Sequence, residues 1–258
     1  MKQAIKLLLK FIPRPLLIRL SLAARKPLHL IYKGNNTECP VCGKTSRKFL
    51  PYGYGNANKD NRLCPYCLSL ERHRLLWLFL KEKTSFFNDD LKVLHIAPEQ
   101  PFINKFKKLS NIDYITADLY SPVVDVKTDI RDMVFNDNEF DFVICNHVLE
   151  HIDDEQKAMK EILRVMKPGG KAILQVPIDY SLDTTFEDPK ITSKKDREKY
   201  YGQYDHVRLY GKDYPQRLRK AGFEVTEDDF VNSFSPEEQE RYRFDKNEII
   251  YFCKKPIN

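Results

Sequence analysis

Glycine is scarce in this 258-residue sequence: there are nine in total and none between Gly55 and Gly169. This gap excludes the Gly-x-Gly-x-x-Gly turn on which dinucleotide-binding folds hold a pyrophosphate, so an NAD-dependent enzyme is disfavoured. Acidic residues are absent from residues 1–36, which hold eight Lys or Arg. Because these eight exceed the net charge of +6, residues 37–258 sum to −2. Most of the chain therefore lacks the excess of basic charge that nucleic-acid phosphates require.

Long apolar runs are also missing. Residues 5–12 carry apolar side chains at helical spacing before Pro13, but basic residues interrupt the run. We therefore expect neither an export signal nor a membrane-spanning helix. A second apolar group at residues 16–20 is flanked by basic residues. Two interpretations stay open: a peripheral membrane contact through residues 1–30, or a helix packed on its own domain with its basic side chains in water.

The cysteine pattern does not resemble a disulfide framework. Four of the six cysteines form two Cys-Pro-x-Cys pairs separated by 21 residues, namely Cys39, Cys42, Cys64 and Cys67. Two such pairs can supply four thiolates to one structural zinc ion in a closed tetrahedral site. Unrelated buried cysteines or a redox pair are the alternatives. Metal-bound thiolates favour a reducing compartment, and we expect a cytoplasmic protein.

Short apolar runs alternate with amphipathic stretches beyond residue 68. We expect Ser69 to cap a helix, and Lys167-Pro-Gly-Gly170 to end another. The expected strands are 92–96, 114–117, 140–145, 171–176, 223–225 and 249–252, and the later helices are 102–109, 155–166 and 214–221. This alternation predicts an α/β fold with a doubly wound, mostly parallel sheet. The expected domains are a basic segment (1–36), a zinc-binding module with a connecting helix (37–84) and the α/β domain (85–258).

Residues from about 91 to 253 resemble the class I, Rossmann-like methyltransferases. The motifs that carry the resemblance are Thr116-Ala-Asp-Leu-Tyr120, Thr128-Asp-Ile130, Phe140-Asp-Phe-Val-Ile-Cys-Asn-His-Val-Leu-Glu-His151 and Leu163-Arg-Val-Met-Lys-Pro-Gly-Gly170. The resemblance implies methyl transfer with S-adenosylmethionine as cofactor.

Cofactor contacts are expected at the carboxyl ends of the strands, where open α/β sheets bind ligands. The residues expected there are Ile96, Ala97, Glu99, Asp118, Leu119, Asp129, Ile130, Asn146 and His147. Asp118 ends the second strand, where its carboxylate can accept hydrogen bonds from both ribose hydroxyls. Asp129 would approach the adenine amino group and Ile130 would cover the ring. Both acids have a plainer interpretation as solvated loop residues.

The first motif departs from the family pattern. Where the family usually has a glycine-rich turn, this chain has His95-Ile-Ala-Pro-Glu-Gln-Pro101. Ala97 is small enough to let the cofactor approach, and Glu99 could bind its amino group. A degenerate relative that binds no cofactor is the alternative.

The candidate catalytic bases are His151 and His206. His147, Glu150 and His151 recur at helical spacing, so they could hold a proton acceptor or a divalent ion, or could serve the structure alone. His206 lies in a long insertion, a usual place for substrate-binding loops. With Tyr200, Tyr201 and Arg208, this insertion could form an acceptor pocket.

The methyl acceptor cannot be identified from these residues. The favoured acceptor is a small molecule, a glycan or a lipid precursor. An RNA methyltransferase, and hence a nucleic-acid partner, stays open as an alternative, as does a non-catalytic binding module that retains the fold.

Overall fold

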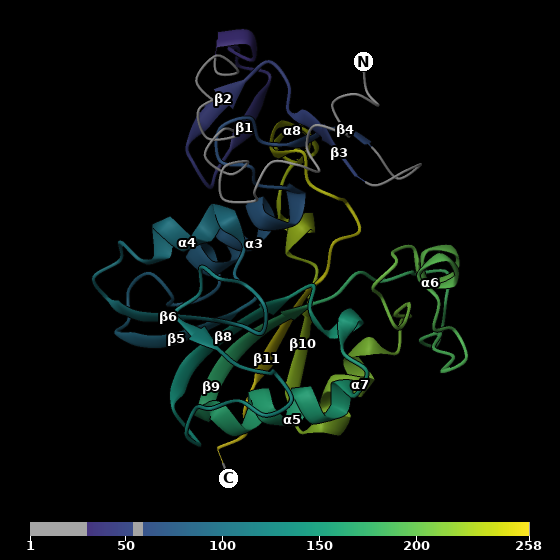
Figure 1. Ribbon diagram of the computed structural model, residues 1–258. Coiled ribbons are helices and arrows are strands. Elements are labelled where there is room, and N and C mark those ends of the chain that lie inside the picture. The colour runs from purple at the N-terminus through teal and green to yellow at the C-terminus, as the bar shows by residue number, and fades with distance from the viewer. Residues whose placement is uncertain (1–29, 54–58, 258) are drawn as a thin grey trace. The chain divides into compact units, whose positions relative to one another are not determined.

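The computed structural model describes residues 30–53 and 59–257 (Figure 1). The helix expected before Pro13 and the membrane contact expected through residues 1–30 fall almost entirely outside these residues. The chain forms two compact units. The first comprises Met1–Leu78 with Phe234–Lys246, and the second comprises Phe79–Ser233 with Asn247–Asn258. Residues 234–246 were expected within the α/β domain (85–258), and their contacts group them with the N-terminal unit.

The second unit is built on a seven-stranded sheet. Its strands are β5 (Leu91–Ile96), β6 (Ile112–Asp118), β7 (Val126–Lys127), β8 (Phe140–Asn146), β9 (Met166–Gln175), β10 (Glu224–Asp228) and β11 (Ile250–Lys254). They lie in the order β10-β11-β9-β8-β5-β6-β7, and only β11 runs antiparallel to its neighbours. This topology confirms the predicted Rossmann-like, mostly parallel sheet.

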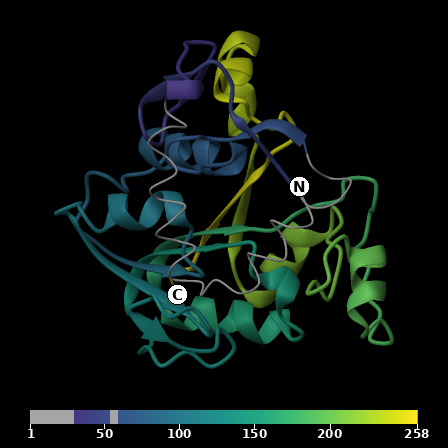
Figure 2. The same ribbon diagram turned by 45° about the horizontal axis from the view of Figure 1, so that its top comes forward.

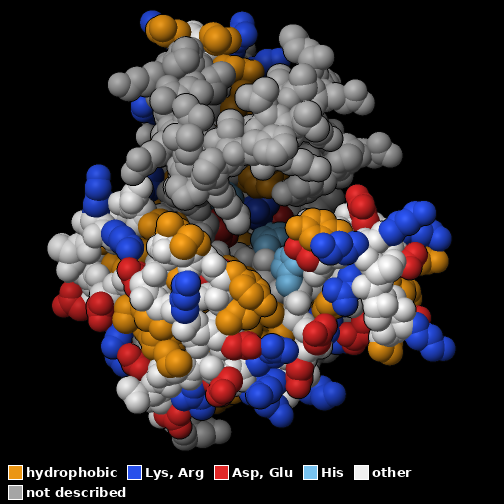
Figure 3. Space-filling model, viewed as in Figure 1, with side chains coloured by type: hydrophobic (Ala, Val, Ile, Leu, Met, Phe, Trp, Pro, Cys, Tyr) orange, Lys and Arg blue, Asp and Glu red, His pale blue; other side chains and the backbone are white. Residues whose placement is uncertain are grey.

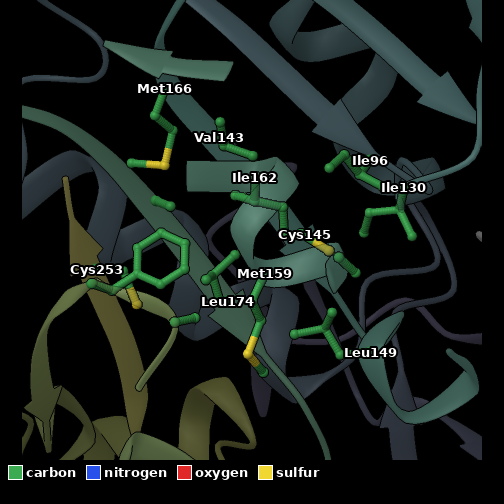
Figure 4. Close-up of a cluster of buried hydrophobic side chains, with 14 of the residues drawn as sticks. Ile96, Ile130, Val143, Cys145, Leu149, Met159, Ile162, Met166, Leu174 and Cys253 are labelled. Carbon is green, nitrogen blue, oxygen red and sulfur yellow. The ribbon is translucent and has the colours of Figure 1, made fainter. Parts of the chain in front are cut away.

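Helices cover both faces of this sheet. The helices are α4 (Gln100–Phe106), α5 (Glu155–Val165), α6 (Lys194–Tyr201) and α7 (Tyr214–Ala221), with short 3₁₀ turns η2 (Leu149–His151) and η3 (Phe230–Ser233). On one face, Phe106 of α4 packs edge-on against Tyr114 of β6. On the other face, Met159 and Ile162 of α5 lie in one buried cluster with Leu174 of β9 (Figure 4). The segment that carries α6 lies to one side of the sheet in both ribbon views (Figures 1 and 2).

Because side chains alternate along a strand, β5 contributes buried residues to both faces of the sheet. Leu94 and Ile96 belong to the cluster beneath α5, whereas His95 contacts the aromatic rings beneath α4. Successive residues of a strand point to opposite faces, so a strand buried on both sides reads as a continuous apolar run. His95 interrupts that run, and its side chain is fully buried.

The boundary between α5 and β9 differs from the prediction. The helix ends at Val165, and the Lys167–Gly170 segment lies within β9 instead of forming a separate turn. Gly169 has a φ of +76°, and a Cβ on Gly170 would meet the Lys167 carbonyl oxygen at 2.8 Å. The two glycines therefore let the strand begin directly after the helix, with an irregular register against β8.

The first unit contains two small antiparallel sheets. They are formed by β1 (Thr37–Cys39) with β2 (Lys44–Ser46) and by β3 (Leu50–Tyr52) with β4 (Lys59–Leu63), and the unit also contains α8 (Pro236–Tyr242) and the start of α3 (Glu71–Glu82). Arg74 of α3 is fully buried, and its guanidinium donates to the carbonyl oxygens of Arg62, Ser69, Tyr242 and Arg243. These bonds attach the segment 234–246 to the N-terminal unit.

Among the described residues, no helix is long and apolar enough to cross a bilayer.

Candidate functional site

Four cysteine side chains converge in the first unit, as their paired spacing predicts. The Sγ atoms of Cys39 and Cys67 are 3.5 Å apart, and those of Cys42 and Cys64 are 3.8 Å apart. All four are free thiols, since a disulfide would join its sulfurs at about 2.05 Å. Four thiolates about 2.3 Å from a zinc ion form a tetrahedron with edges of about 3.8 Å. The two sulfur separations are close to the edge length of such a tetrahedron.

Tight turns hold these cysteines in place. Gly43 has a φ of +67° and donates its backbone N–H to the Cys39 carbonyl oxygen at 2.8 Å. Leu68 has a φ of +62° and makes the equivalent bond to Cys64 at 3.0 Å. Ser69 does not cap α3 as expected. Its Oγ lies 3.0 Å from the Cys39 Sγ, and the helix begins two residues later. The Ser69 hydroxyl therefore contacts the cysteine cluster instead of capping the helix.

A pocket of about 550 Å³ lies where β5, β6 and β8 end in the second unit. Seven of the nine residues predicted to contact the cofactor line it, namely Ile96, Ala97, Asp118, Leu119, Asp129, Ile130 and His147. The predicted base His151 lines it too, whereas Glu99, Asn146 and His206 do not. The fold thus brings together predicted residues from Ile96 to His151, which are up to 55 positions apart in the sequence.

Two residues of the pocket wall have left-handed backbone conformations. Ala97 follows β5 with a φ of +47°, and His147 follows β8 with a φ of +54°. This conformation costs a residue with a Cβ about 1–2 kcal/mol relative to its usual regions. The glycine-free first motif therefore makes a left-handed turn with an alanine. Such strain is concentrated at functional sites, where the surrounding structure maintains it.

Asp118 has one oxygen engaged and one available. Its Oδ1 accepts the backbone N–H groups of Tyr120 and Ser121 at 2.7 and 2.6 Å. Within residues 30–53 and 59–257, no hydrogen bond to Oδ2 is found. The carboxylate thus fixes the turn after β6 with one oxygen and leaves the other for a ligand.

Asp129 is paired with the neighbouring Arg131, which was not among the predicted site residues. The Arg131 guanidinium donates to both carboxylate oxygens, at 3.0 Å to Oδ1 and 2.7 Å to Oδ2. This hydrogen bonding, joined by the Arg131 backbone N–H, lowers the pKa of Asp129. Arg131 also lines the pocket. A ligand that reaches Asp129 must share its oxygens with this cation.

Glu99 and Asn146 belong to a chain of hydrogen bonds behind the pocket wall. The Asn146 Nδ2 donates to Glu99 Oε1 at 3.0 Å, and Glu99 Oε2 lies 2.6 Å from His95 Nε2. The other ring nitrogen of His95 lies 2.7 Å from the hydroxyl of Tyr114. The pKa of Tyr114 is strongly raised by burial and by the negative charge of Glu99. This chain of hydrogen bonds links residues of the three neighbouring strands β5, β6 and β8.

The residues of the insertion after β9 that were expected to form an acceptor pocket do not line this pocket. Tyr201 and Arg208 are buried, at 2% and 3% exposure, and neither they nor Tyr200 line the pocket. Burial turns the Arg208 guanidinium towards backbone carbonyl groups instead of solvent. Asp205 of the same insertion does reach the pocket.

Several lining residues had no signal of their own in the sequence. They are Arg131, Met133, Asp153 and Asp205. Arg131 and Met133 lie within four residues of Asp129 in the sequence, and only this proximity could have pointed to them as site residues. Asp205 could not be found, since only the fold brings the insertion to the ends of the strands.

Comparison with known proteins gives a family for the central part of the chain. Residues 85–174 match the model of a methyltransferase domain. A demethylmenaquinone methyltransferase of Staphylococcus carnosus is 41% identical over 69 residues, which are 27% of this chain and 24% of that protein. An uncharacterised protein of Methanocaldococcus jannaschii is 34% identical over 94 residues, which are 36% of this chain and 42% of that protein. The chain spans less than half the length of these relatives.

Solved structures resemble this chain over a longer stretch. The cyclase SpnF aligns with a TM-score of 0.52 over 85% of this chain and 92% of its own, at 17% sequence identity. At this identity the likeness concerns the fold.

Proposed function

This chain carries a class I, S-adenosylmethionine-dependent methyltransferase domain, and from this premise we propose that it transfers a methyl group to a small-molecule acceptor. The observation that carries the proposal is the pocket itself. Its walls combine the single available oxygen of Asp118 with six other residues that are expected to contact the cofactor.

The residues present fit this cofactor. A volume of about 550 Å³ lies in the usual range for small-molecule sites. The free Oδ2 of Asp118 would accept the ribose hydroxyls, while Ile96 and Ile130 offer apolar surface to the adenine. Ala97 leaves the room that glycine usually provides. When bound, S-adenosylmethionine supplies an electrophilic methyl group on a sulfonium sulfur.

The protein's own contribution to this chemistry is binding and orientation. Methyl transfer needs the acceptor in line with the methyl group and, for some acceptors, removal of a proton. His151 lines the pocket and is the residue that we assign to contact the acceptor. His206 lies behind it, with the ring centroids 4.7 Å apart, so we assign it an indirect role.

The four-cysteine cluster is proposed to hold a structural zinc ion. The two sulfur separations of 3.5 and 3.8 Å suit a tetrahedral thiolate site with no open position for chemistry. Thiolates of this kind require a reducing compartment, which supports a cytoplasmic location.

A small-molecule acceptor is favoured over RNA on grounds of charge. Residues 37–258 sum to −2, and on the face shown in Figure 3 Lys and Arg side chains are interspersed with Asp and Glu. An RNA-binding surface would instead gather basic side chains. The name of the Staphylococcus carnosus relative, a demethylmenaquinone methyltransferase, gives the same class of acceptor.

Isothermal titration of the zinc-loaded full chain with S-adenosylhomocysteine tests the proposal. We expect saturable binding of one molecule per chain. Absence of binding at millimolar concentration would contradict it and favour a non-catalytic module.

A further inference from the structure

A second group of metal-ligating side chains lies beside the pocket. Glu150 and His151 are on the 3₁₀ turn η2, and His206 is on the insertion. Each offers a ligand atom, and the three atoms lie within 4.8 Å of one another. Two imidazoles and one carboxylate are a set that binds first-row divalent metals and leaves coordination positions open.

Glu150 is buried with an unpartnered oxygen. The residue is 1% exposed, and its Oε2 has no hydrogen-bond partner among the described residues. The other oxygen, Oε1, lies 3.4 Å from the Nδ1 of His147. A buried carboxylate oxygen without a partner is costly, so one is expected where a ligand satisfies it. A cation bound to Oε2 would do so.

Both histidines have one ring nitrogen next to a backbone carbonyl oxygen. The Nδ1 of His206 lies 3.2 Å from the Tyr201 carbonyl oxygen, and the Nδ1 of His151 lies 3.2 Å from the Asp205 carbonyl oxygen. A carbonyl oxygen only accepts hydrogen bonds, so both Nδ1 atoms carry protons. The lone pairs are thereby left on the Nε2 atoms, and this arrangement is the usual support of metal-binding histidines.

The two segments that carry these ligands are joined by a buried arginine. The Arg208 guanidinium donates to the carbonyl oxygens of Leu149, Ile152 and Asp153 at 2.9, 2.6 and 2.9 Å. The backbone N–H of Val207 donates to the Glu150 carbonyl oxygen at 2.9 Å. The insertion is therefore held against η2 before any metal binds.

We propose that Glu150, His151 and His206 bind a first-row divalent transition-metal ion at the edge of the pocket. Resting on the proposed function, we further infer that the ion binds the oxygen of a hydroxyl-bearing methyl acceptor. His151 is shared by the metal group and the pocket wall, so an acceptor in the pocket can complete the coordination. The ion lowers the pKa of the bound hydroxyl, whose proton passes to water, and leaves the oxygen negatively charged.

Mn²⁺ is the probe that separates this site from the cysteine cluster. Manganese prefers carboxylate oxygens to thiolates, whereas zinc retains the thiolates. In the zinc-loaded full chain, electron paramagnetic resonance should detect one bound Mn²⁺ per chain, with ¹⁴N couplings from imidazole. His151→Ala, which changes a half-buried residue, should weaken Mn²⁺ binding at least tenfold. Glu150→Gln should do the same, while Glu224→Gln, a change of an exposed carboxylate, should leave binding unchanged.

The outcomes separate the two proposals. No Mn²⁺ binding by the wild type, or equal binding by His151→Ala with no ¹⁴N coupling, would overturn the metal site, even if S-adenosylhomocysteine binds. Mn²⁺ binding without S-adenosylhomocysteine binding would support the metal site and overturn its role towards a methyl acceptor.

Discussion

Ala97 takes the place that a glycine usually has in this family. Its φ of +47° puts a methyl group where the backbone prefers none, and it lines the pocket. Sequence inspection identified the missing glycine but could not give the backbone angle. The structure shows that the chain still makes the left-handed turn after β5, although alanine is strained in this conformation.

Substitutions of Ala97 should separate the effect of its backbone strain from the effect of its side-chain size on cofactor binding. Ala97→Gly removes about 1–2 kcal/mol of left-handed strain but adds chain entropy to the unfolded state, so the net change in stability should stay within about 1 kcal/mol. Its affinity for S-adenosylhomocysteine should remain within about threefold of the wild type, because the pocket loses no contact that the ligand needs. Ala97→Val places a β-branched side chain at this angle and should weaken binding at least about tenfold. Calorimetry of both variants checks this, and wild-type affinity in Ala97→Val would contradict it.

Some residues of the candidate site could be predicted from the sequence, and others could not. Asp118 and His147 were found because each follows directly on an apolar strand, where parallel sheets bind ligands. The role of Glu99 was less accessible. The sequence placed it in the turn, but only the fold shows that its carboxylate contacts both His95 and Asn146. Its direct contact with the cofactor stays a prediction.

At the scale of elements, α5 is connected to the loop before β8 by a charged clamp. Arg164 donates to the carbonyl oxygens of Met133 and Phe135, and Glu161 accepts from both Arg164 and the Met133 backbone N–H. The hydrogen bond from Arg164 lowers the pKa of Glu161 below its ordinary value of 4.5. The loop that leads from the Asp129 turn to β8 is thereby held to the helix.

The clamp should stabilise the protein in a pH-dependent way. Because the pKa of Glu161 is depressed on folding, its contribution is fully present above pH 4.5 and is lost as the pH falls through the folded pKa. Glu161→Gln should lower the free energy of unfolding by about 1–2 kcal/mol at pH 7. Its difference from the wild type should shrink below about pH 4.5. Urea unfolding at pH 7 and pH 4 tests this, with Glu224→Gln as charge-matched control, and a difference independent of pH would count against the clamp.

Elements were predicted more accurately than their ends. The strands that became β5, β6, β8 and β11 were found within about two residues because apolar runs define them. The helix expected at 102–109 begins at Gln100 and ends at Phe106. Residues 167–170 were misassigned because Pro and Gly usually end elements. Here a close approach of Gly170 to neighbouring carbonyl groups lets them start a strand.

At the scale of the whole molecule, a segment near the C-terminal end of the sequence, residues 234–246, belongs to the N-terminal unit. Arg241 of α8 donates to the Glu38 carboxylate at 2.8 Å, across 203 positions of sequence. No local sequence pattern in residues 234–246 predicts a contact with the N-terminal unit. The Cys-Pro-x-Cys pairs, by contrast, were sufficient to predict where four sulfurs meet, because their spacing carries the ligand geometry.

The four cysteines of the first unit should hold one zinc ion. Elemental analysis of protein prepared without chelator should give one zinc per chain, and Cys42→Ser should lose it and destabilise the unit, since binding energy here is folding energy. The affinity for S-adenosylhomocysteine should stay within about threefold, because all residues lining the pocket belong to the second unit. Well under one zinc in the wild type, or full zinc in Cys42→Ser, would refute the assignment.

Isothermal titration of S-adenosylhomocysteine into Asp118→Asn tests the central claim most directly. Asparagine keeps an oxygen for the N–H groups of Tyr120 and Ser121 but replaces Oδ2 by a group that cannot accept the ribose hydroxyls. Loss of these charged hydrogen bonds should weaken binding by about 1.5–3 kcal/mol, or about 10- to 100-fold, with little change in melting temperature. Asp129→Ala should cost less, because Arg131 already engages both of its oxygens. Wild-type affinity in Asp118→Asn would contradict the assignment of this pocket to the cofactor.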